Sequence, residues 1–491
     1  MIVDAFLQCL QQQFPFQLTA KQTEAARRLC LFLYSSDPQS MFILRGYAGT
    51  GKTTLVSSIV RVLHQLKLET VLLAPTGRAA KVFSLNAGYP AYTIHKEIYR
   101  QHSLTSEQTH FDLDHNKHKA ALFVVDESSM ISAIDDGQSV FGTGSLLADL
   151  LQYVYSVPGC RILFVGDNAQ LPPVGSNISP ALSVDFFTQL GYHVSGFQLT
   201  EVMRQTAQSG ILHNATALRH RIHDNKEFGL PVIKTRGYKD IVCLHGQDIL
   251  DTLEECYEGY GQDQTIVLTR SNKQANAYNK GIRQIFFDRD DTLTLGDMVM
   301  VVRNNYYWTE RLRLRIAKQQ KQDKPTLVPP PMDFIANGDI AQVISVGDEY
   351  EFYDLHFADV RLRFPDYDNF ELNARVILDV LQSDTPALPT ELDNKLYLGV
   401  SADYAQERNK RERMKRIRED ANYNALQLKF AYAVTCHKAQ GGQWRNVFVD
   451  QGWLPPEAID RSYYRWLYTA MTRATDKLYL VNWPEKQIEG E

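Results

Sequence analysis

The sequence predicts an α/β protein in which parallel strands lead into polar turns. Three observations support this fold class. Apolar runs of strand length recur between residues 41 and 165, and a polar turn follows each of them. One of these turns is rich in glycine and ends in Lys-Thr. Further along, residues 297–364 contain alternating or buried strand patterns opened by turn residues, which is typical of a small β-barrel.

Length and composition limit the class of protein. With 491 residues, the chain is too long for one core and should form about two to four domains. Hydrophobic residues make up 44% and charged residues 22%, as is usual for globular domains. The formal net charge of −5 gives no overall attraction to polyanions. Any polyanion site must therefore be a local basic groove.

The cysteines and the apolar stretches bear on location. The chain has 6 cysteines without CxxC pairing, which argues against a zinc site or a disulfide framework and favours a reducing compartment. The N-terminus lacks a basic start followed by an apolar run, and no uninterrupted apolar stretch approaches the ~20 residues of a membrane span. We therefore expect a cytoplasmic protein that makes no membrane contact.

The glycine-rich turn is the strongest local signal. Residues 46–53 read GYAGTGKT and lie between an apolar run, residues 41–44, and a helical pattern, residues 54–66. Glycines let backbone N–H groups turn toward phosphates, and the helix N-terminus adds partial positive charge. Lys52 can neutralise the outer phosphates and the Thr53 hydroxyl can ligate magnesium. This pattern predicts a nucleoside triphosphate site formed by Gly46, Ala48, Gly49, Thr50, Gly51, Lys52, Thr53 and Thr54.

Two adjacent carboxylates follow the apolar run at residues 121–125. Because neighbouring side chains on a strand point in different directions, Asp126 and Glu127 can perform separate tasks. Asp126 can hold magnesium through water, and Glu127 can accept the proton of an attacking water. Acidic pairs at strand ends are common by chance, but the upstream phosphate loop favours function.

Two further apolar runs end in polar turns, at residues 75–81 and 166–174. In a doubly wound sheet, ligands collect at the carboxyl ends of the strands, so both turns should lie on the working edge. Gln170 can bond a terminal phosphate, although a plain Pro-rich loop is the alternative. Gln22, in the helical pattern at residues 18–34, offers a donor and an acceptor that suit an adenine edge. A solvated helix glutamine is an equally good interpretation.

Taken in order, the motifs GYAGTGKT, APTGRAAK, TIHK, DESSM and GDNAQLPPV resemble the first motor half of superfamily 1B helicases of the RecD and Dda type. Residues 199–205, 431–444 and 467–474 resemble the fourth, fifth and sixth motifs of the second half. The resemblance implies two RecA-like halves with ATP in the cleft between them. It implies that Arg204 and Arg473 reach toward the γ-phosphate.

The fifth motif also belongs to the implied nucleotide site, through Gly442 and through a ribose contact from Gln443. Two positions depart from the family pattern. Ala439 stands where a serine is commoner, and Gln443 stands where the family often has glutamate.

The resemblance spans residues 18–475 and implies a domain organisation. Residues 1–190 should form the first RecA-like domain, with an inserted hairpin at about 100–119. Residues 191–290 and 425–491 should form the second, and residues 291–424 an SH3-like barrel insertion. Residues 311–331 are basic and then Pro-rich, which predicts an exposed excursion, and residues 391–420 predict a charged helix. Whether these two segments touch DNA is left open.

The resemblance implies an ATP-dependent DNA helicase that moves 5′ to 3′ on single-stranded DNA and acts at junctions with duplex DNA, with ATP and Mg²⁺ bound to a monomer. Contacts to the strand should be mostly to its backbone and by base stacking. Alternatives are a translocase that displaces proteins, a motor subunit of a nuclease complex and, from another class, a regulatory nucleotide switch. The expected DNA contacts are Pro75, Thr76, Thr93, His95, Thr435, His437 and Lys438, with Phe111 in the hairpin as the wedge.

Overall fold

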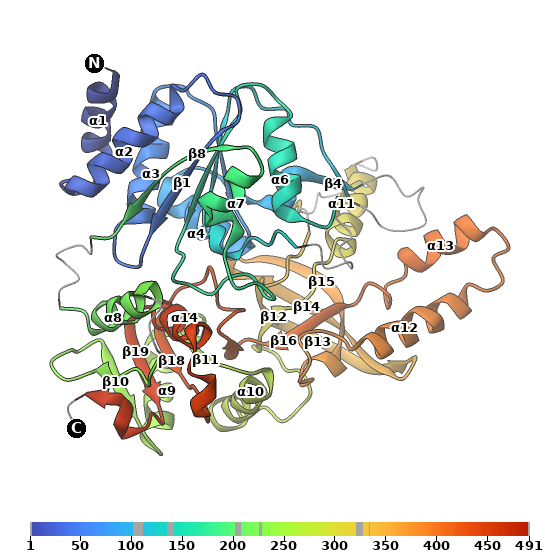
Figure 1. The fold of residues 1–491 in the computed structure, drawn as a ribbon. Helices are drawn as coiled ribbons and strands as arrows, with labels where there is room; N and C mark the ends of the chain where they lie inside the picture. Colours follow the sequence, from blue (N-terminus) through green and yellow to red (C-terminus); the bar gives the residue numbers. More distant parts are fainter. Residues whose placement is uncertain are drawn as a thin grey trace.

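Two α/β lobes and a β-barrel make up the protein. The computed structural model describes residues 2–101, 111–134, 142–201, 208–224, 228–320, 328–332 and 334–489. Figure 1 shows the first lobe in blue to green, the second lobe in green and red, and the barrel in yellow to orange beside them. In this part of the chain, no helix is long and apolar enough to cross a bilayer.

The first lobe is built on a parallel sheet with strand order β3-β2-β6-β7-β1-β8. The apolar runs that predict strands at residues 41–44, 70–74, 121–125 and 161–165 all lie in this sheet. Its strands are β1 (Ser40–Gly46), β2 (Thr70–Ala74), β3 (Ala91–Thr93), β6 (Leu122–Val125), β7 (Arg161–Gly166) and β8 (His193–Leu199).

Helices cover both faces of this sheet, which explains why its strands are continuous apolar runs. Because successive side chains point to opposite faces, Phe42 and Leu44 of β1 pack against one group of helices. Met41 and Ile43 pack against the other group. The first group is α1 (Ile2–Gln13), α2 (Ala20–Leu33), α3 (Lys52–Gln65) and α4 (Gly77–Ala87), and the second is α5 (Ile94–Ile98), α6 (Leu146–Tyr155) and α7 (Val184–Gln189).

The second lobe has a parallel sheet of its own, with strand order β10-β19-β18-β11-β17. Neighbours β11 and β17 lie side by side although the whole barrel separates them in sequence. The strands are β10 (Ile241–Leu244), β11 (Thr265–Thr269), β17 (Ala433–Thr435), β18 (Trp444–Val449) and β19 (Ala474–Val481). The main helices are α8 (Gly210–Asp224), α9 (Asp248–Tyr260), α10 (Asn272–Phe287) and α14 (Arg461–Met471).

The predicted barrel is present and closed. Apolar side chains alternate inward along its strands, as in β14, where Phe357, Leu362 and Phe364 are buried. The barrel strands are β12 (Met298–Val301), β13 (Ile340–Phe352), β14 (Leu355–Phe364), β15 (Phe370–Ile377) and β16 (Leu426–Phe430).

Two strands lie on the other side of a predicted domain boundary. Strand β8 pairs with β1 in the first lobe, although the predicted boundary at residue 190 assigns it to the second. Strand β16 closes the barrel, although the boundary at residue 424 assigns it to the second lobe. β8 is an edge strand with several half-exposed residues, so its sequence lacks the apolar run that marks the other strands.

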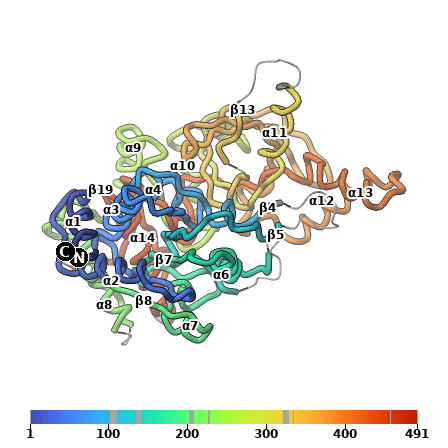
Figure 2. Tube along the Cα trace, turned by 90° about the horizontal axis from the view of Figure 1, so that it is seen from above, coloured from blue at the N-terminus to red at the C-terminus, as the bar shows by residue number. Residues whose placement is uncertain are grey.

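The two excursions of the barrel segment are helical. Residues Tyr307–Gln320 form α11, in the segment for which the sequence predicts an exposed excursion. The single charged helix predicted at residues 391–420 is wrong in detail, because it is two helices, α12 (Thr390–Asp403) and α13 (Lys410–Arg418). The Asn409 side chain starts α13 by accepting from the backbone N–H groups of Arg411 and Glu412. Figures 1 and 2 show both helices projecting away from the two sheets.

The predicted hairpin is present at its base. Strands β4 (Tyr99–Gln101) and β5 (Phe111–Leu113) pair antiparallel, with Gln101 opposite Phe111. Residues 102–110 lie outside the described residues. The hairpin leaves the first lobe directly after α5, on the side where Figure 2 shows the barrel and α12.

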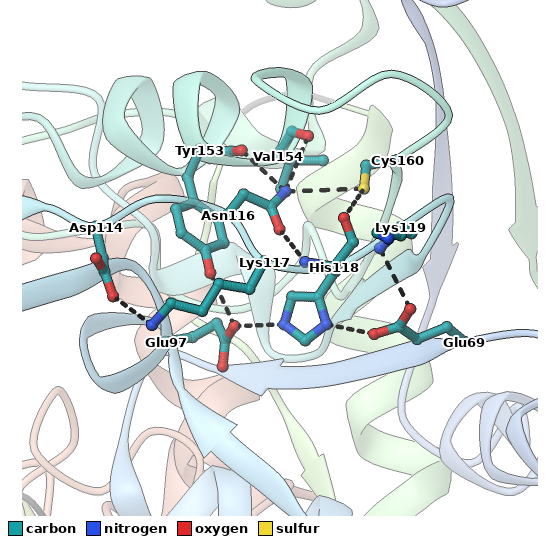
Figure 3. A network of polar contacts seen from close by, with 10 residues as sticks. All are labelled: Glu69, Glu97, Asp114, Asn116, Lys117, His118, Lys119, Tyr153, Val154 and Cys160. Atoms are coloured by element: carbon teal, nitrogen blue, oxygen red, sulfur yellow. Dashed lines mark hydrogen bonds and ion pairs between the residues drawn. The ribbon is translucent and has the colours of Figure 1, made fainter.

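A histidine held by two carboxylates braces the start of strands β2 and β6 and the short helix α5 (Figure 3). His118 Nδ1 lies 2.5 Å from Glu69 Oε1, and His118 Nε2 lies 2.8 Å from Glu97 Oε1. The Tyr153 hydroxyl also donates to Glu97, at 3.0 Å. Partial burial disfavours the charged imidazolium, but the two carboxylates outweigh it and raise the pKa of His118.

We expect His118→Gln to lower the free energy of unfolding more at pH 6 than at pH 8.5. Because the folded-state pKa of His118 is raised, its contribution is present below the unfolded pKa of about 6.5 and is lost as pH rises through the folded pKa. The loss at pH 6 should be ~1 kcal/mol, the scale of a partly exposed charge-assisted hydrogen bond. Urea denaturation at both pH values measures it, with the exposed His115→Gln as control. An equal loss at both pH values contradicts the prediction.

Candidate active site

The phosphate loop joins β1 to α3 in a shape fixed by its own contacts. Gly49 and Gly51 have φ of 74° and 72°, in the left-handed region that favours glycine. The Thr50 hydroxyl donates to the Tyr47 carbonyl at 2.7 Å. Lys52 is the first residue of α3, and its Nζ donates to the Gly46 carbonyl at 3.4 Å. The backbone thus presents a helix N-terminus and an ammonium group to the same hollow.

Gln22 supports this loop from helix α2. Its Nε2 donates to the Thr50 carbonyl at 3.1 Å, and its Oε1 accepts from the Thr19 backbone N–H at 3.0 Å. The second bond completes the capping box that starts α2. The structure therefore ties Gln22 to the loop and to the helix cap, and its adenine contact stays a prediction.

The acidic pair follows β6 beside the loop. Burial and the neighbouring charge of Glu127 raise the pKa of Asp126 to about 6, although Lys52 acts in the opposite direction. Glu127 has φ of 49°, which is uncommon for a residue with a side chain. Its Oε2 is buried and finds no hydrogen-bond partner within the described ranges. Such strained and unsatisfied groups cluster at catalytic sites.

The turn after β7 supplies the other first-lobe residue of the site. Gln170 is buried, and its Oε1 has no hydrogen-bond partner among the described residues. In the same turn, burial raises the pKa of Asp167 while the charge of Lys52 opposes this shift. Lys52, Asp126 and Asp167 therefore share one electrostatic environment at the carboxyl edge of the sheet.

The second lobe closes on this edge through α14. The Ala48 N–H of the phosphate loop donates to the Tyr468 hydroxyl at 2.9 Å, and the Leu171 N–H donates to the Thr469 hydroxyl at 2.9 Å. Gln440 Nε2 donates to the Leu171 carbonyl at 2.8 Å. The turns that carry the first-lobe residues therefore face the second lobe directly.

The two expected arginines are placed differently. Arg473 is 3% exposed, and it donates to the carbonyls of Thr469 and Gly442, both at 3.1 Å. Its guanidinium is thus held by its own lobe and is hydrogen-bonded to the fifth motif. Arg204 lies outside the described residues. The Gln443 side chain is exposed, while its carbonyl accepts from Arg78 at 3.0 Å, so the ribose contact stays a prediction.

The expected DNA contacts of both lobes meet along one edge. Thr76 and Thr93 each cap a helix, α4 and α5 respectively, and follow the ends of β2 and β3, while Pro75 lies directly before Thr76. From the other lobe, a Cβ placed on Gly441 would lie 3.2 Å from the Thr76 hydroxyl. Figure 1 shows α4 directly above the barrel and the second lobe.

Three of these residues are partly desolvated. Burial lowers the pKa of His95 to about 4, lowers the pKa of His437 and lowers the pKa of Lys438 to about 8. Lys438 follows Thr435 in the turn after β17, at the carboxyl edge of the second sheet. A polyanion beside these groups would favour their charged forms.

Phe111 does not occupy the position that the wedge requires. It is 5% exposed, and its ring centroid lies 4.2 Å from that of Tyr306 in the barrel segment. The isolated aromatic residue thus anchors the hairpin base in a core and is covered from solvent. Its assignment as a DNA contact is therefore corrected, and a wedge would have to come from residues 102–110, outside the described residues.

Sequence reasoning missed several residues that the structure brings to the cleft. Tyr468 and Thr469 lie in the sixth motif and Asp167 in the turn of Gln170, but none was singled out. The available signal was a pair of hydroxyl-bearing residues in a helix, α14, whose residues from 463 to 471 are all buried. A cavity of 350 Å³ between the first lobe and the barrel was also missed, and it is lined by Tyr92, Thr93, Lys96, Phe334 and Tyr367, among others.

Two family models match the chain. An AAA domain matches residues 17–230, and a UvrD-like helicase C-terminal domain matches residues 430–481. The first covers the phosphate loop, the acidic pair and α8, and the second covers β17, β18, α14 and most of β19. The two matches therefore coincide with the two lobes that form the cleft.

Curated relatives match parts of the chain. The ATP-dependent RecD2 DNA helicase of Deinococcus radiodurans is 32% identical over 186 residues, which are 37% of this chain and 22% of that protein. The ATP-dependent DNA helicase dda of Enterobacteria phage T4 is 28% identical over 272 residues, 52% of this chain and 55% of that protein. The match thus spans about half or less of either relative.

Among solved structures, a Pif1 helicase from Bacteroides in complex with ADP-AlF3 and ssDNA covers 97% of this chain and 95% of its own, at 16% identity and a TM-score of 0.46. The two family models lie in the order that the motifs predict, on either side of the barrel insertion. Both curated relatives carry the motif series of the first lobe's family. The chain therefore belongs to the superfamily 1B helicases of the RecD and Dda type.

Proposed function

We propose that this chain is an ATP-dependent DNA helicase that moves 5′ to 3′ along single-stranded DNA and opens duplex DNA ahead of it. One observation carries the proposal: the second lobe bonds directly to the phosphate loop, through Tyr468 and Ala48. A regulatory switch needs no second lobe at its nucleotide, whereas a motor must change the contact between two lobes during turnover. The printed activities of the two curated relatives support the same function.

The residues at the cleft fit ATP and Mg²⁺. Glu127 Oε2 and Gln170 Oε1 are buried and unsatisfied in the part of the chain that the structure describes, so each has bonding capacity for a ligand or an attacking water. Thr53 and Asp126 would hold the metal ion, which neutralises phosphate charge when bound. The raised pKa of Asp126 indicates a carboxylate that lacks sufficient positive charge nearby.

The chain's own residues would divide the work. Lys52 and the loop N–H groups bind the phosphates, Glu127 accepts the proton of the attacking water, and Gln170 bonds the terminal phosphate. Arg204 and Arg473 would reach toward the phosphates from the second lobe. For Arg473 this requires exchange of its present carbonyl partners, Thr469 and Gly442, for phosphate oxygens.

The DNA strand would cross the edge where the two lobes meet. Pro75, Thr76, Thr93 and His95 would contact it from the first lobe, and Thr435, His437 and Lys438 from the second. These groups suit the sugar-phosphate backbone and give little sequence preference. The cavity beside Thr93, with Phe334 and Tyr367 in its lining, has aromatic faces on which a base can stack. We infer a monomer in a reducing, cytoplasmic compartment, supported by cysteines that are all free.

Two assays test the function. ATPase activity should rise on addition of single-stranded DNA, and the isolated chain should separate a forked duplex with a 5′ tail but not one with only a 3′ tail. ATPase stimulation without strand separation would favour a translocase or a motor subunit that needs partners. Activity that ignores DNA would favour the nucleotide switch and contradict the proposal.

Lys52→Ala should reduce DNA-stimulated ATPase by at least about 10²-fold, because the phosphate charge loses its partner. Steady-state turnover under saturating DNA measures this effect. The exposed Lys119→Ala is the control and should retain full activity. Turnover within a few-fold of wild type in Lys52→Ala would remove the loop as the site of hydrolysis.

Glu127→Gln should hydrolyse ATP about 10²–10⁴-fold more slowly, the usual effect of losing a general base, while it still binds nucleotide and DNA. The amide keeps the shape of the side chain but cannot accept the proton. Single-turnover hydrolysis and DNA binding by fluorescence anisotropy measure the two properties, with Glu24→Gln on α2 as control. Near-normal hydrolysis would exclude Glu127 as the base.

A further inference from the structure

Tyr468 of α14 joins two turns of the opposite lobe through one hydroxyl group. The hydroxyl accepts from the Ala48 N–H at 2.9 Å and donates to Asp167 Oδ2 at 2.6 Å. Tyr468 is 1% exposed and Asp167 is also buried. Asp167 Oδ1 in turn accepts from the Ala169 N–H at 2.9 Å. The second lobe thereby links the phosphate loop to the turn that carries Gln170.

Arg219 of α8 contacts the neighbouring residue of the same loop. Its Cζ lies 4.2 Å from the centroid of the Tyr47 ring, whose hydroxyl accepts from Gln198 of β8. Arg219 is 7% exposed, and its Nη1 is buried without a hydrogen-bond partner among the described residues. Helices α8 and α14 pack against each other, so the two contacts form one surface of the second lobe.

We propose that Tyr468 and Arg219, here called the loop clamp, are positioning residues for ATP turnover. They hold residues 47 and 48 of the phosphate loop against the second lobe, so that the loop, the Gln170 turn and α14 move as one unit. The inference rests on the proposed function, since it assigns these residues a part in ATP hydrolysis. Neither residue is assigned to nucleotide or DNA contact.

The clamp should affect turnover more than nucleotide binding. Lys52 and the start of α3 hold the phosphates from the first lobe alone, and the loop keeps its shape through Thr50 and Gln22. Hydrolysis also requires groups from the second lobe, in particular Arg473, which follows Tyr468 by little more than one turn of chain. Loss of the clamp therefore separates the loop from its partner lobe without removing the binding site.

The hydroxyl of Tyr468 is not needed to pack α14. Two other buried tyrosines of this helix, Tyr463 and Tyr464, bond within the second lobe. The Tyr463 hydroxyl donates to Gln451 and that of Tyr464 to the Gly229 carbonyl, both at 2.6 Å. Only the third hydroxyl, on Tyr468, is directed across the cleft among these helix tyrosines of the described chain. This contrast provides a matched control for mutation.

The first test is Tyr468→Phe in the full chain, with Tyr464→Phe as control. Each change removes one buried hydroxyl from α14, but only Tyr468→Phe releases the Ala48 N–H and the Asp167 carboxylate. We expect kcat of DNA-stimulated ATPase to fall about tenfold in Tyr468→Phe, while the Kd for a non-hydrolysable ATP analogue changes less than about twofold. Tyr464→Phe should keep the wild-type kcat and should lose as much thermal stability as Tyr468→Phe.

The second test is a double-mutant cycle between Arg219→Lys and Tyr47→Leu. Lysine keeps the charge but lacks the planar group that stacks on a ring, so each single variant should lower kcat. If the two residues act as one contact, the double variant should be no slower than the slower single variant. Independent, multiplicative losses would show that Arg219 does not act through Tyr47 and would overturn its part in the clamp.

The outcomes distinguish this inference from the proposed function. If the wild-type chain shows no DNA-stimulated ATPase, the proposed function fails and the clamp fails with it. If wild type turns over ATP and Tyr468→Phe has unchanged or raised kcat, the clamp alone is wrong. If both tyrosine variants lose kcat equally, the effect is structural and the clamp is also wrong. Should Tyr468→Phe fail to fold, the Arg219 and Tyr47 cycle decides.

Discussion

The phosphate loop of this protein needs two lobes to complete it, and the hydrogen bond between Ala48 and Tyr468 is where they meet. Parallel strands deliver the ends of β1, β6 and β7 to one edge, so the loop, the acidic pair and the Gln170 turn come together there. The first lobe alone leaves this edge open. The second lobe covers it with α14, whose buried face provides hydroxyl groups for the turns opposite.

The cleft also contains polar groups that the protein leaves without partners. Most buried polar atoms in folded proteins are hydrogen-bonded, because a missing bond costs ~1–3 kcal/mol. Here Glu127 Oε2, Gln170 Oε1 and Arg219 Nη1 are unsatisfied within the residues that the structure covers. Arg473, by contrast, is fully engaged with its own lobe. The structure therefore combines a site prepared for ligand with an arginine that must leave its partners before it can act.

The sequence predicted those features that depend on local pattern. The central strands, the phosphate loop and the acidic pair each have a continuous apolar run followed by a distinctive turn. β8 was assigned to the wrong lobe because an edge strand is only half-buried. The environment of Phe111 depends on a contact with Tyr306, almost two hundred residues away, which no local pattern records. The orientation of Arg473 likewise depends on which carbonyl groups lie nearby after folding, and motif position does not determine that.

The barrel connects to both lobes, so it must respond when the lobes move. Its link to the second lobe is a buried ion network: the Asp297 carboxylate pairs with Arg283 and Arg289, each at 3.0 Å, and accepts from the Tyr432 hydroxyl at 3.1 Å. Such a network is rigid when every member is satisfied, and the strand β16 leads directly into β17 of the motor sheet.

Toward the first lobe, the barrel makes close contacts of another kind. Tyr367 donates to the buried Asp339 carboxylate at 3.1 Å, and a Cβ on Gly77 at the start of α4 would lie 2.6 Å from the same oxygen. Only glycine fits there, because any side chain would push α4 away from the barrel. Phe111 provides the second contact, through Tyr306 at the base of the hairpin. Since one contact set is a satisfied ion network and the other is close packing at a helix start, a change in the angle between the lobes must be absorbed mainly at the α4 and hairpin contacts. The barrel therefore moves with the second lobe and slides against the first, beside the turn that carries Thr76.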